Sequence, residues 1–181
     1  MTTLNLGTVV AFQAGLHAQL IPYIAALHAS CITHDHTPAT FVPPLSHEKL
    51  LYWWKDRIAE VSAGTRLIFL LVRNDLSSSI TVNISPIKGA DLLGVVMLDL
   101  PAAETGLFRA SVEQLLIHTT CRRQGGAKNL IQTIETEAVL RGKTLLVCPA
   151  PWLLRAKRKK MGAGLPTDSS HYSSADVECR I

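Results

Sequence analysis

A short segment rich in arginine and glycine constrains the fold of this chain more than any other part of its sequence. The segment comprises Arg122, Arg123, Gln124, Gly125, Gly126, Ala127 and Lys128. An apolar run over residues 112–118 precedes it and predicts a strand, and an amphipathic run over residues 129–141 follows it and predicts a helix. The sequence therefore predicts a strand, a glycine turn and a helix start in direct succession.

A turn of this kind is suited to binding a phosphorylated ligand. The first N–H groups of a helix have no acceptor within the helix, and the helix dipole places partial positive charge at that end. Glycine lets the backbone approach a phosphate closely, and the nearby arginines and lysine add formal charge. The alternative is a tight turn whose basic side chains are simply solvated.

The hydrophobic pattern of the whole chain predicts one α/β domain. In chain order it predicts a strand, two helices, three strands, a helix and a strand, over residues 8–12, 16–27, 46–64, 66–72, 93–100, 111–118, 129–141 and 141–147. Ser46 is the expected N-cap of the second helix, and residues 74–90 are expected to form a loop or an insertion. At 181 residues the chain is long enough for a single domain with a substantial core.

The spacing of the turn disfavours two common phosphate-binding motifs and matches a third. It fits neither the G-x-x-x-x-G-K-[ST] pattern nor the G-x-G-x-x-G pattern. From Arg122 to Ala127 it reads R-x-x-G-x-A, which resembles the Q/R-x-x-G-x-G/A loop of the GNAT acetyltransferase superfamily. The resemblance covers about a hundred residues, including the strands at 93–98 and 108–117 and the helix and strand that follow the loop. It is similar in particular to small-molecule acetyltransferases of the tabtoxin-resistance type.

The resemblance implies a mixed, mostly antiparallel central sheet flanked by helices, formed by an acetyl-CoA-binding domain over residues 8–148. It also implies that the backbone amides of residues 124–128 face the pyrophosphate of acetyl-CoA, with Arg122 and Arg123 nearby. The pantetheine arm would bond the backbone of the fourth strand near Leu116 and Ile117. No metal ion is implied, and the segment around His34 and His36 is read as an ordinary loop.

Glu113 is the candidate catalytic base, because the superfamily often uses a carboxylate on this strand. With strict alternation it shares a face with Leu115 and Ile117 and would point toward the site. The alternative is a surface glutamate paired with a basic residue. His118 is a second candidate, because histidine titrates near neutral pH. The family's tyrosine acid has no matching position here, and Tyr172 receives no role.

The last residues, 149–181, depart from the resemblance and predict a disordered basic and polar tail. They lack the alternating pattern of the two strands that the family has there, so the C-terminal strands are expected to be missing or replaced. The fifth strand would then be an exposed edge, which predicts self-association. Five basic residues lie within 155–160, so nucleic-acid binding is a less favoured reading, and a solvated tail is preferred.

The sequence thus favours an N-acetyltransferase that moves an acetyl group from acetyl-CoA to the amine of a small molecule. The alternative is a catalytically defective relative that at most binds acetyl-CoA. The N-terminus lacks the pattern of a secretory signal, no apolar run reaches the length of a membrane helix, and the four cysteines form no C-x-x-C pair. These features predict a cytoplasmic protein with reduced thiols and no membrane contact.

Overall fold

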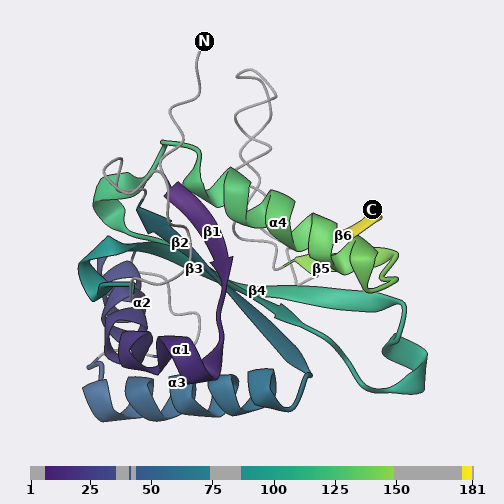
Figure 1. The fold of residues 1–181 in the computed structure, drawn as a ribbon, viewed down its shortest axis with the longest axis horizontal. Helices are drawn as coiled ribbons and strands as arrows, with labels where there is room; N and C mark the ends of the chain where they lie inside the picture. The colour runs from purple at the N-terminus through teal and green to yellow at the C-terminus, as the bar shows by residue number, and fades with distance from the viewer. Residues whose placement is uncertain (1–6, 36–40, 42–43, 74–86, 149–176, 181) are drawn as a thin grey trace, which may run out of the picture.

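The computed structural model describes residues 7–35, 41, 44–73, 87–148 and 177–180 (Figure 1). Its strands are β1 Gly7–Ala11, β2 Arg66–Arg73, β3 Leu92–Asp99, β4 Arg109–Ile117, β5 Leu145–Cys148 and β6 Val177–Arg180. Its α-helices are α1 Ala14–His17, α2 Ile21–Asp35, α3 His47–Ser62 and α4 Gly126–Leu140. Short 3-10 turns are η1 Ala18–Leu20, η2 Gly89–Asp91, η3 Glu104–Gly106 and η4 Thr119–Cys121.

One six-stranded sheet joins all the strands in the order β1-β2-β3-β4-β5-β6. Every neighbouring pair is antiparallel except β4 and β5, which run parallel. Successive antiparallel strands need only short connections, whereas the parallel pair needs a crossover, and α4 supplies it. The predicted α/β fold with a mixed, mostly antiparallel sheet flanked by helices is confirmed.

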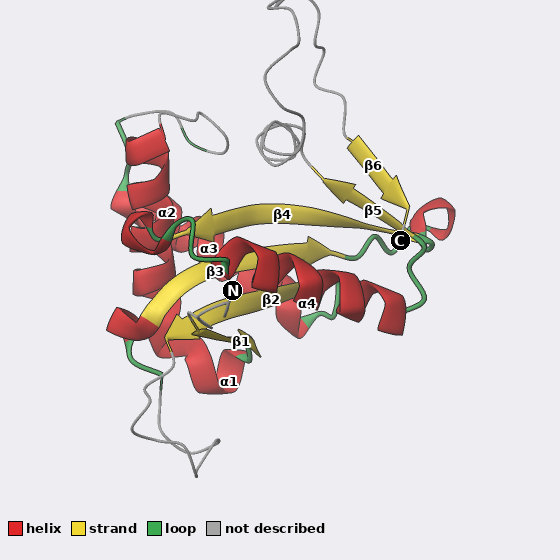
Figure 2. Ribbon diagram, turned by 90° about the horizontal axis from the view of Figure 1, so that it is seen from above, coloured by secondary structure: helices red, strands yellow, loops and turns green. Residues whose placement is uncertain are grey.

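Helices cover both faces of this sheet (Figures 1 and 2). In β2, Ile68 and Leu70 belong to the core beneath α2 and α3, whereas Phe69 and Leu71 belong to the core beneath α4. This division follows from the alternation of side chains along a strand, and it explains why β2 and β3 are nearly continuous runs of apolar residues. None of the helices in the described part of the chain is long and apolar enough to cross a membrane.

Helix α3 begins where the sequence predicts the start of its second helix. Ser46 is the N-cap of α3, and its hydroxyl accepts a hydrogen bond from the backbone N–H of Lys49 at 3.4 Å. A serine in this position satisfies one of the otherwise unbonded N–H groups of the first turn. Of the segment expected to be a loop, residues 74–86 lie outside the described residues, and η2 occupies Gly89–Asp91.

A bulge interrupts β4 and changes which of its side chains share a face. Across β3, Leu116 stands opposite Val95 and Glu113 stands opposite Met97, so two residues of β4 face one residue of β3 between these pairs. Gln114 absorbs the extra residue with a positive φ of 47°. The bulge places Glu113 and Leu116 on the face of Val95 and Met97, beneath α2 and α3.

The expected alternation of Glu113 with Leu115 and Ile117 is therefore wrong. Leu115 and Ile117 contact the core beneath α4, on the opposite face from Glu113. Strict alternation fails because a bulge adds one residue to the strand and shifts the period by one.

β4 and β5 separate soon after they begin to pair. Their register covers only Arg109–Ser111 against Leu145–Val147. Figure 2 shows β5 and β6 turning away from β4, so the sheet is splayed between these two strands. The splay opens toward the end of β4 that leads into residues 122–128, and it brings the predicted ligand-binding turn to the mouth of the opening.

The C-terminal part of the chain differs from the sequence expectation at one place. β6 pairs antiparallel with β5, with Cys148 opposite Val177 and Leu145 opposite Arg180. The sequence predicts an exposed edge at β5, whereas β6 of the same chain covers this edge. Self-association of the protein stays a prediction. Strand pairing uses backbone groups, so a short segment without an alternating apolar pattern can still add to an open edge. Residues 149–176, which include the basic cluster and Tyr172, lie outside the described residues.

A buried histidine lies among aromatic rings between α2 and α3. The ring of His28 is 1% exposed and lies 5.7 Å from Phe41, 5.5 Å from Trp53 and 5.9 Å from Trp54, measured between centroids. Its Nδ1 has no hydrogen-bond partner among the described residues. Burial in this apolar surrounding disfavours the charged imidazolium and lowers the pKa of His28 to about 4.

We expect the stability of the fold to depend on pH through His28. Its pKa is 6.5 when unfolded and about 4 when folded, so the unfolded state binds more protons between these values. The contribution of neutral His28 to the free energy of unfolding should be fully present above pH 6.5. The free energy of unfolding should then fall by about 3 kcal/mol as the pH drops to 4. Urea unfolding of the parent and of His28→Leu at pH 4.0 to 7.5 measures this. The variant should show a clearly shallower pH dependence, with a residual slope from His17, whose pKa burial also lowers. Parallel curves would contradict the assignment.

Candidate functional site

The glycine turn leaves β4 through η4 and enters α4 with two left-handed residues. Arg123 has a φ of 64° and Gly125 a φ of 89°, and Gly125 is the N-cap of α4. The first helical hydrogen bond of α4 runs from the N–H of Asn129 to the carbonyl of Gly125, at 3.1 Å. The N–H groups of Gly126, Ala127 and Lys128 precede this bond and lie in the first turn, where a helix offers no acceptor.

This geometry matches the predicted anion cradle. Three backbone N–H groups and the positive end of the α4 dipole lie at one turn, and the side chains of Arg123 and Lys128 are exposed beside it. Gln124 is also exposed, and its side-chain amide donates to the carbonyl of Thr120 at 3.2 Å, which holds the turn together. The turn can therefore offer both backbone donors and formal positive charge to a phosphate group.

Arg122, which the resemblance places near the ligand, forms an ion pair with α2. Its guanidinium forms two hydrogen bonds with the carboxylate of Asp35 at the end of α2, Nη1 to Oδ1 at 2.5 Å and Nη2 to Oδ2 at 2.9 Å. Hydrogen bonding to Asp35 raises the pKa of Arg122, so the charge is permanent. The charge of Arg122 is thus paired with Asp35 of α2. Of the two adjacent arginines, Arg123 is the one exposed beside the first turn of α4.

The end of β4 next to the splay carries the residues expected to meet the pantetheine arm. Leu116 is partly buried and packs against the core beneath α2 and α3. The carbonyl of Ile117 accepts a hydrogen bond from Nε of Arg122 at 3.2 Å and one from the thiol of Cys31 at 3.5 Å. A ligand that extends the sheet here would have to share this acceptor or bond to another backbone group of β4.

The predicted base Glu113 belongs to a charge cluster centred on a buried arginine. Arg66, 5% exposed, donates to Glu113 at 2.6 Å, to Glu60 of α3 at 2.5 Å and to Asp99 of β3 at 3.1 Å. Burial would lower the pKa of Arg66, but hydrogen bonds to Glu60 and Glu113 outweigh it and raise that pKa. Burial also raises the pKa of Asp99, because the attraction of Arg66 does not offset lost hydration. Glu113 is thus a half-exposed carboxylate that forms an ion pair with a buried arginine.

The second candidate, His118, lies between β4 and η4. Its Nδ1 accepts a hydrogen bond from the N–H of Thr120 at 3.4 Å and lies 2.8 Å from the hydroxyl of the same residue. His118 lines a cavity of about 370 Å³ that α2, β3 and η4 form together. It caps the short turn η4 that precedes the glycine segment, which is a local structural role.

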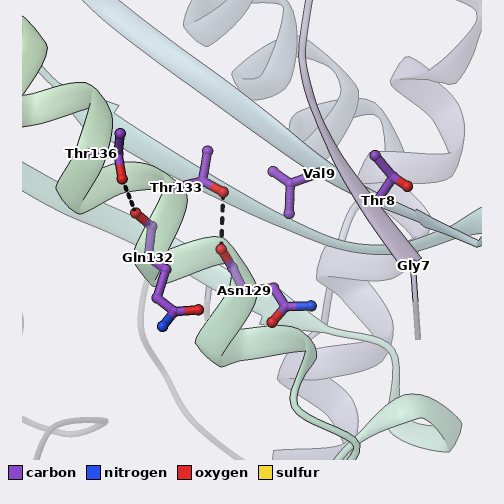
Figure 3. Close-up of a pocket in the computed structure, with 7 residues that line it drawn as sticks. All are labelled: Gly7, Thr8, Val9, Asn129, Gln132, Thr133 and Thr136. Atoms are coloured by element: carbon purple, nitrogen blue, oxygen red, sulfur yellow. Dashed lines mark hydrogen bonds between the residues drawn. The ribbon is translucent and has the colours of Figure 1, made fainter. Parts of the chain in front are cut away.

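A larger cavity of about 470 Å³ lies between β1 and α4 (Figure 3). Gly7, Thr8, Val9, Asn129, Gln132, Thr133 and Thr136 line it. The hydroxyls of Thr133 and Thr136 donate to the backbone carbonyls of their own helix, at 3.0 and 2.9 Å (Figure 3). None of the predicted site residues lines this cavity, so its size does not make it the candidate site.

Three aromatic side chains lie close to His28. Trp54 is fully buried, whereas Trp53 and Phe41 are half-buried. His34 is the penultimate residue of α2, and His36 lies outside the described residues. Across the described part of the chain, no group of three or more potential metal ligands occurs.

Sequence reasoning missed Asp35, Cys31 and Arg66 as neighbours of the predicted site. All three lie far from it along the chain, 87 residues in the case of Asp35 and Arg122. A signal existed for Arg66, because a charged residue opens an otherwise apolar strand and so needs partners when buried. An acidic residue at the end of a helix is unfavourable next to the negative end of the dipole, so Asp35 also signalled a cationic partner.

Similarity to known proteins is found for the structure of this chain and not for its sequence. No protein-family model and no curated protein sequence matches the chain. One similar solved structure is a Clostridium acetobutylicum protein described as a predicted acetyltransferase, crystallised with acetyl-CoA. It is 10% identical, with a TM-score of 0.54 and coverage of 92% of this chain and 95% of that one.

Two further structures agree with the first. A Desulfovibrio desulfuricans protein assigned to the GNAT family is 14% identical, with a TM-score of 0.56 and coverage of 94% and 95%. An aminoglycoside acetyltransferase from an uncultured soil metagenomic sample is 12% identical, with a TM-score of 0.55 and coverage of 96% and 99%. This chain therefore has the fold of the GNAT acetyltransferases, which confirms the resemblance drawn from the loop and its flanking elements.

The turn should tolerate substitution of Gly125 poorly for conformational reasons alone. A Cβ on Gly125 would meet no atom within 4 Å, so the cost of Gly125→Ala comes only from its φ of +89°. We expect a loss of about 1–2 kcal/mol in unfolding free energy, and a smaller loss for Gly125→Asn. Gly15→Ala in α1 is the matched control, because that glycine also has open space but lacks a positive φ. Urea denaturation should show no loss for the control, and an equally neutral Gly125→Ala would contradict the strain.

Proposed function

We propose that this chain is an acetyl-CoA-dependent N-acetyltransferase that acts on the amine of a small molecule. The observation that carries the proposal is the glycine turn, whose first-turn amides lie at the mouth of the splay between β4 and β5 in a GNAT fold. The free donors fit the two negatively charged phosphates of the pyrophosphate. Beyond Ser111, β4 does not pair with β5 in the described part of the chain, so its backbone there could bond an extended arm that carries a thioester.

Several residues would hold the cofactor. We assign the pyrophosphate to the backbone amides of Gln124, Gly125, Gly126, Ala127 and Lys128, with added charge from Arg123. The pantetheine arm would run along the backbone of β4 near Leu116 and Ile117. Solved structures with this fold include one described as containing acetyl-CoA, which supports the assignment.

The reaction needs the amine and the thioester in one ternary complex. The amine nitrogen forms a bond with the acetyl carbonyl carbon, the carbon–sulfur bond breaks, and CoA leaves with the electron pair of that bond. The attacking amine must lose a proton, and we assign that proton to Glu113, which the bulge turns toward the face of α2 and α3. CoA leaves as a thiolate and is protonated to the thiol.

The substrate class rests on analogy with proteins of the same fold. One neighbour is described as an aminoglycoside acetyltransferase in complex with sisomicin. A small-molecule amine is therefore the acceptor that we propose for this chain. Cys31 and Cys121 form no disulfide, which fits the proposed location in the cytoplasm.

Two observations favour the alternative of a relative that binds acetyl-CoA without transferring its acetyl group. The carboxylate of Glu113 is already paired with Arg66 at 2.6 Å. The carbonyl of Ile117 already accepts two hydrogen bonds. Turnover must therefore be measured separately from binding.

Calorimetric titration with acetyl-CoA tests the cofactor assignment. The parent should bind acetyl-CoA, and Gly125→Glu should abolish binding, because it adds a negative charge to the anion cradle and a side chain at a left-handed residue. Release of free CoA thiol is then followed with a panel of small amines. Release stimulated by an amine supports transfer, binding without such release supports the alternative, and a folded parent that does not bind overturns the proposal.

Glu113→Gln tests the assignment of the base. We expect kcat to fall about 100-fold with little change in the KM for acetyl-CoA, which is the usual effect of removing a general base. Glu60→Gln is the matched control, because Glu60 also pairs with Arg66 but lies on α3. Equal losses in both variants would show that the ion pair, not proton transfer, sets the activity.

A further inference from the structure

The guanidinium of Arg122 joins three parts of the molecule. Besides its two hydrogen bonds to Asp35, it donates from Nε to the carbonyl of Ile117 at 3.2 Å and lies 3.7 Å from the sulfur of Cys31. The side chains of Arg122 and Asp35 are 28% and 24% exposed. One planar group therefore ties the end of α2 to the end of β4, at the first residue of the glycine turn.

Both ends of this ion pair have a physical reason to form it. Asp35 is the last residue of α2, where the negative end of the helix dipole disfavours a carboxylate and favours a cation. Arg122 supplies that cation, and its planar fork matches the two carboxylate oxygens, which strengthens and orients the contact. A lysine in this position could not make the same pair of parallel bonds.

The residues that follow Arg122 have few other supports. Arg123 and Gly125 are both left-handed, Gln124 is held by one side-chain hydrogen bond to Thr120, and Arg123, Gln124 and Gly125 are all exposed. A non-glycine residue with a positive φ is costly and persists only when its surroundings fix the backbone on both sides. α4 fixes the turn after Gly125. Before Arg123, the backbone is held by Cys121, which is buried in the core, and by the side-chain contacts of Arg122.

We propose that Asp35 is a positioning residue for the cofactor turn, acting through Arg122 and without touching the ligand. Its carboxylate holds Arg122 in place, and Arg122 holds the backbone whose amides would meet the pyrophosphate. The effect on acetyl-CoA rests on the proposed function, whereas the effect on the order of the turn does not. Arg122 accordingly serves the turn as an anchor, and its charge, balanced by Asp35, is not offered to the ligand.

The order of the turn can be measured without any cofactor. Backbone ¹⁵N relaxation of the unliganded parent should give order parameters near 0.85 for residues 123–128, as expected for rigid backbone. In Asp35→Asn these values should fall below about 0.6, the range of a flexible segment. Glu137→Gln is the matched control, because it removes an exposed ion pair with Arg141 at the far end of the same helix. Unchanged order parameters in a folded Asp35→Asn would overturn the inference, whatever the protein binds.

A double-mutant cycle on acetyl-CoA affinity tests the link to function. Asp35→Asn and Arg122→Gln should each raise the Kd about fivefold to tenfold, and the double variant should raise it no further, because one unit is broken in each case. If Arg122 contacted the phosphates directly, Asp35→Asn would free its charge and tighten binding, which would overturn the inference. Binding should be unchanged in Glu137→Gln.

The two proposals fail in different ways. A folded parent that does not bind acetyl-CoA would contradict the proposed function. The relaxation experiment would still test the role of Asp35. Should Asp35→Asn fail to fold, Arg122→Lys replaces it, since lysine keeps the charge but lacks the fork. Loss of order in that variant supports the anchoring role, and full order refutes it.

Discussion

The parallel contact between β4 and β5 ends after three residue pairs, and the candidate site depends on where it ends. β4 pairs with β3 along almost its whole length, so it is held firmly on one side while its other side opens toward the turn. The bulge at Gln114 increases the local twist of β4 and turns it away from β5. A site between two strands of one sheet needs such a device, because regular pairing would fill the space with the neighbouring strand.

Two arginines paired with carboxylates show how charge is distributed around the separation of β4 and β5. Arg66 is buried among three carboxylates, and Arg122 is held by one carboxylate at the end of a helix. In both cases the positive charge is neutralised by carboxylates of the same chain. For Arg66 this pairing is needed because a buried cation without partners is far more costly than a paired one. The charge left for an anionic ligand is the charge that the fold does not use, namely the α4 dipole with Arg123 and Lys128.

Much of this arrangement could be predicted from the sequence, and the failures have physical causes. The strands and helices followed from hydrophobic period, Ser46 marked a helix start, and R-x-x-G-x-A marked the turn, because each of these signals is local. The face of Glu113 could not be predicted, since a bulge leaves no reliable mark in a single sequence and one extra residue reverses the alternation. β6 was missed because pairing with β5 depends on backbone groups and on an open edge elsewhere in the chain. The Asp35 contact joins residues 87 positions apart, which no local pattern records.

The bulge also explains how one strand can serve both partners of the proposed reaction. Before Gln114, Glu113 points to the face covered by α2 and α3, and after it β4 continues to the turn that opens α4 on the other face. A ligand lying in the splay would therefore meet the proposed base on one face of the sheet and the anion cradle on the other. Direct transfer in a ternary complex requires the amine and the thioester to be held together in reacting geometry, and both would meet at this part of β4. The ion pair of Arg122 with α2 links these two parts of the site. Helix α2 covers the face on which Glu113 lies, and its last residue holds the proposed cofactor turn. In this arrangement the order of the turn and the position of the acceptor face are set by the same helix.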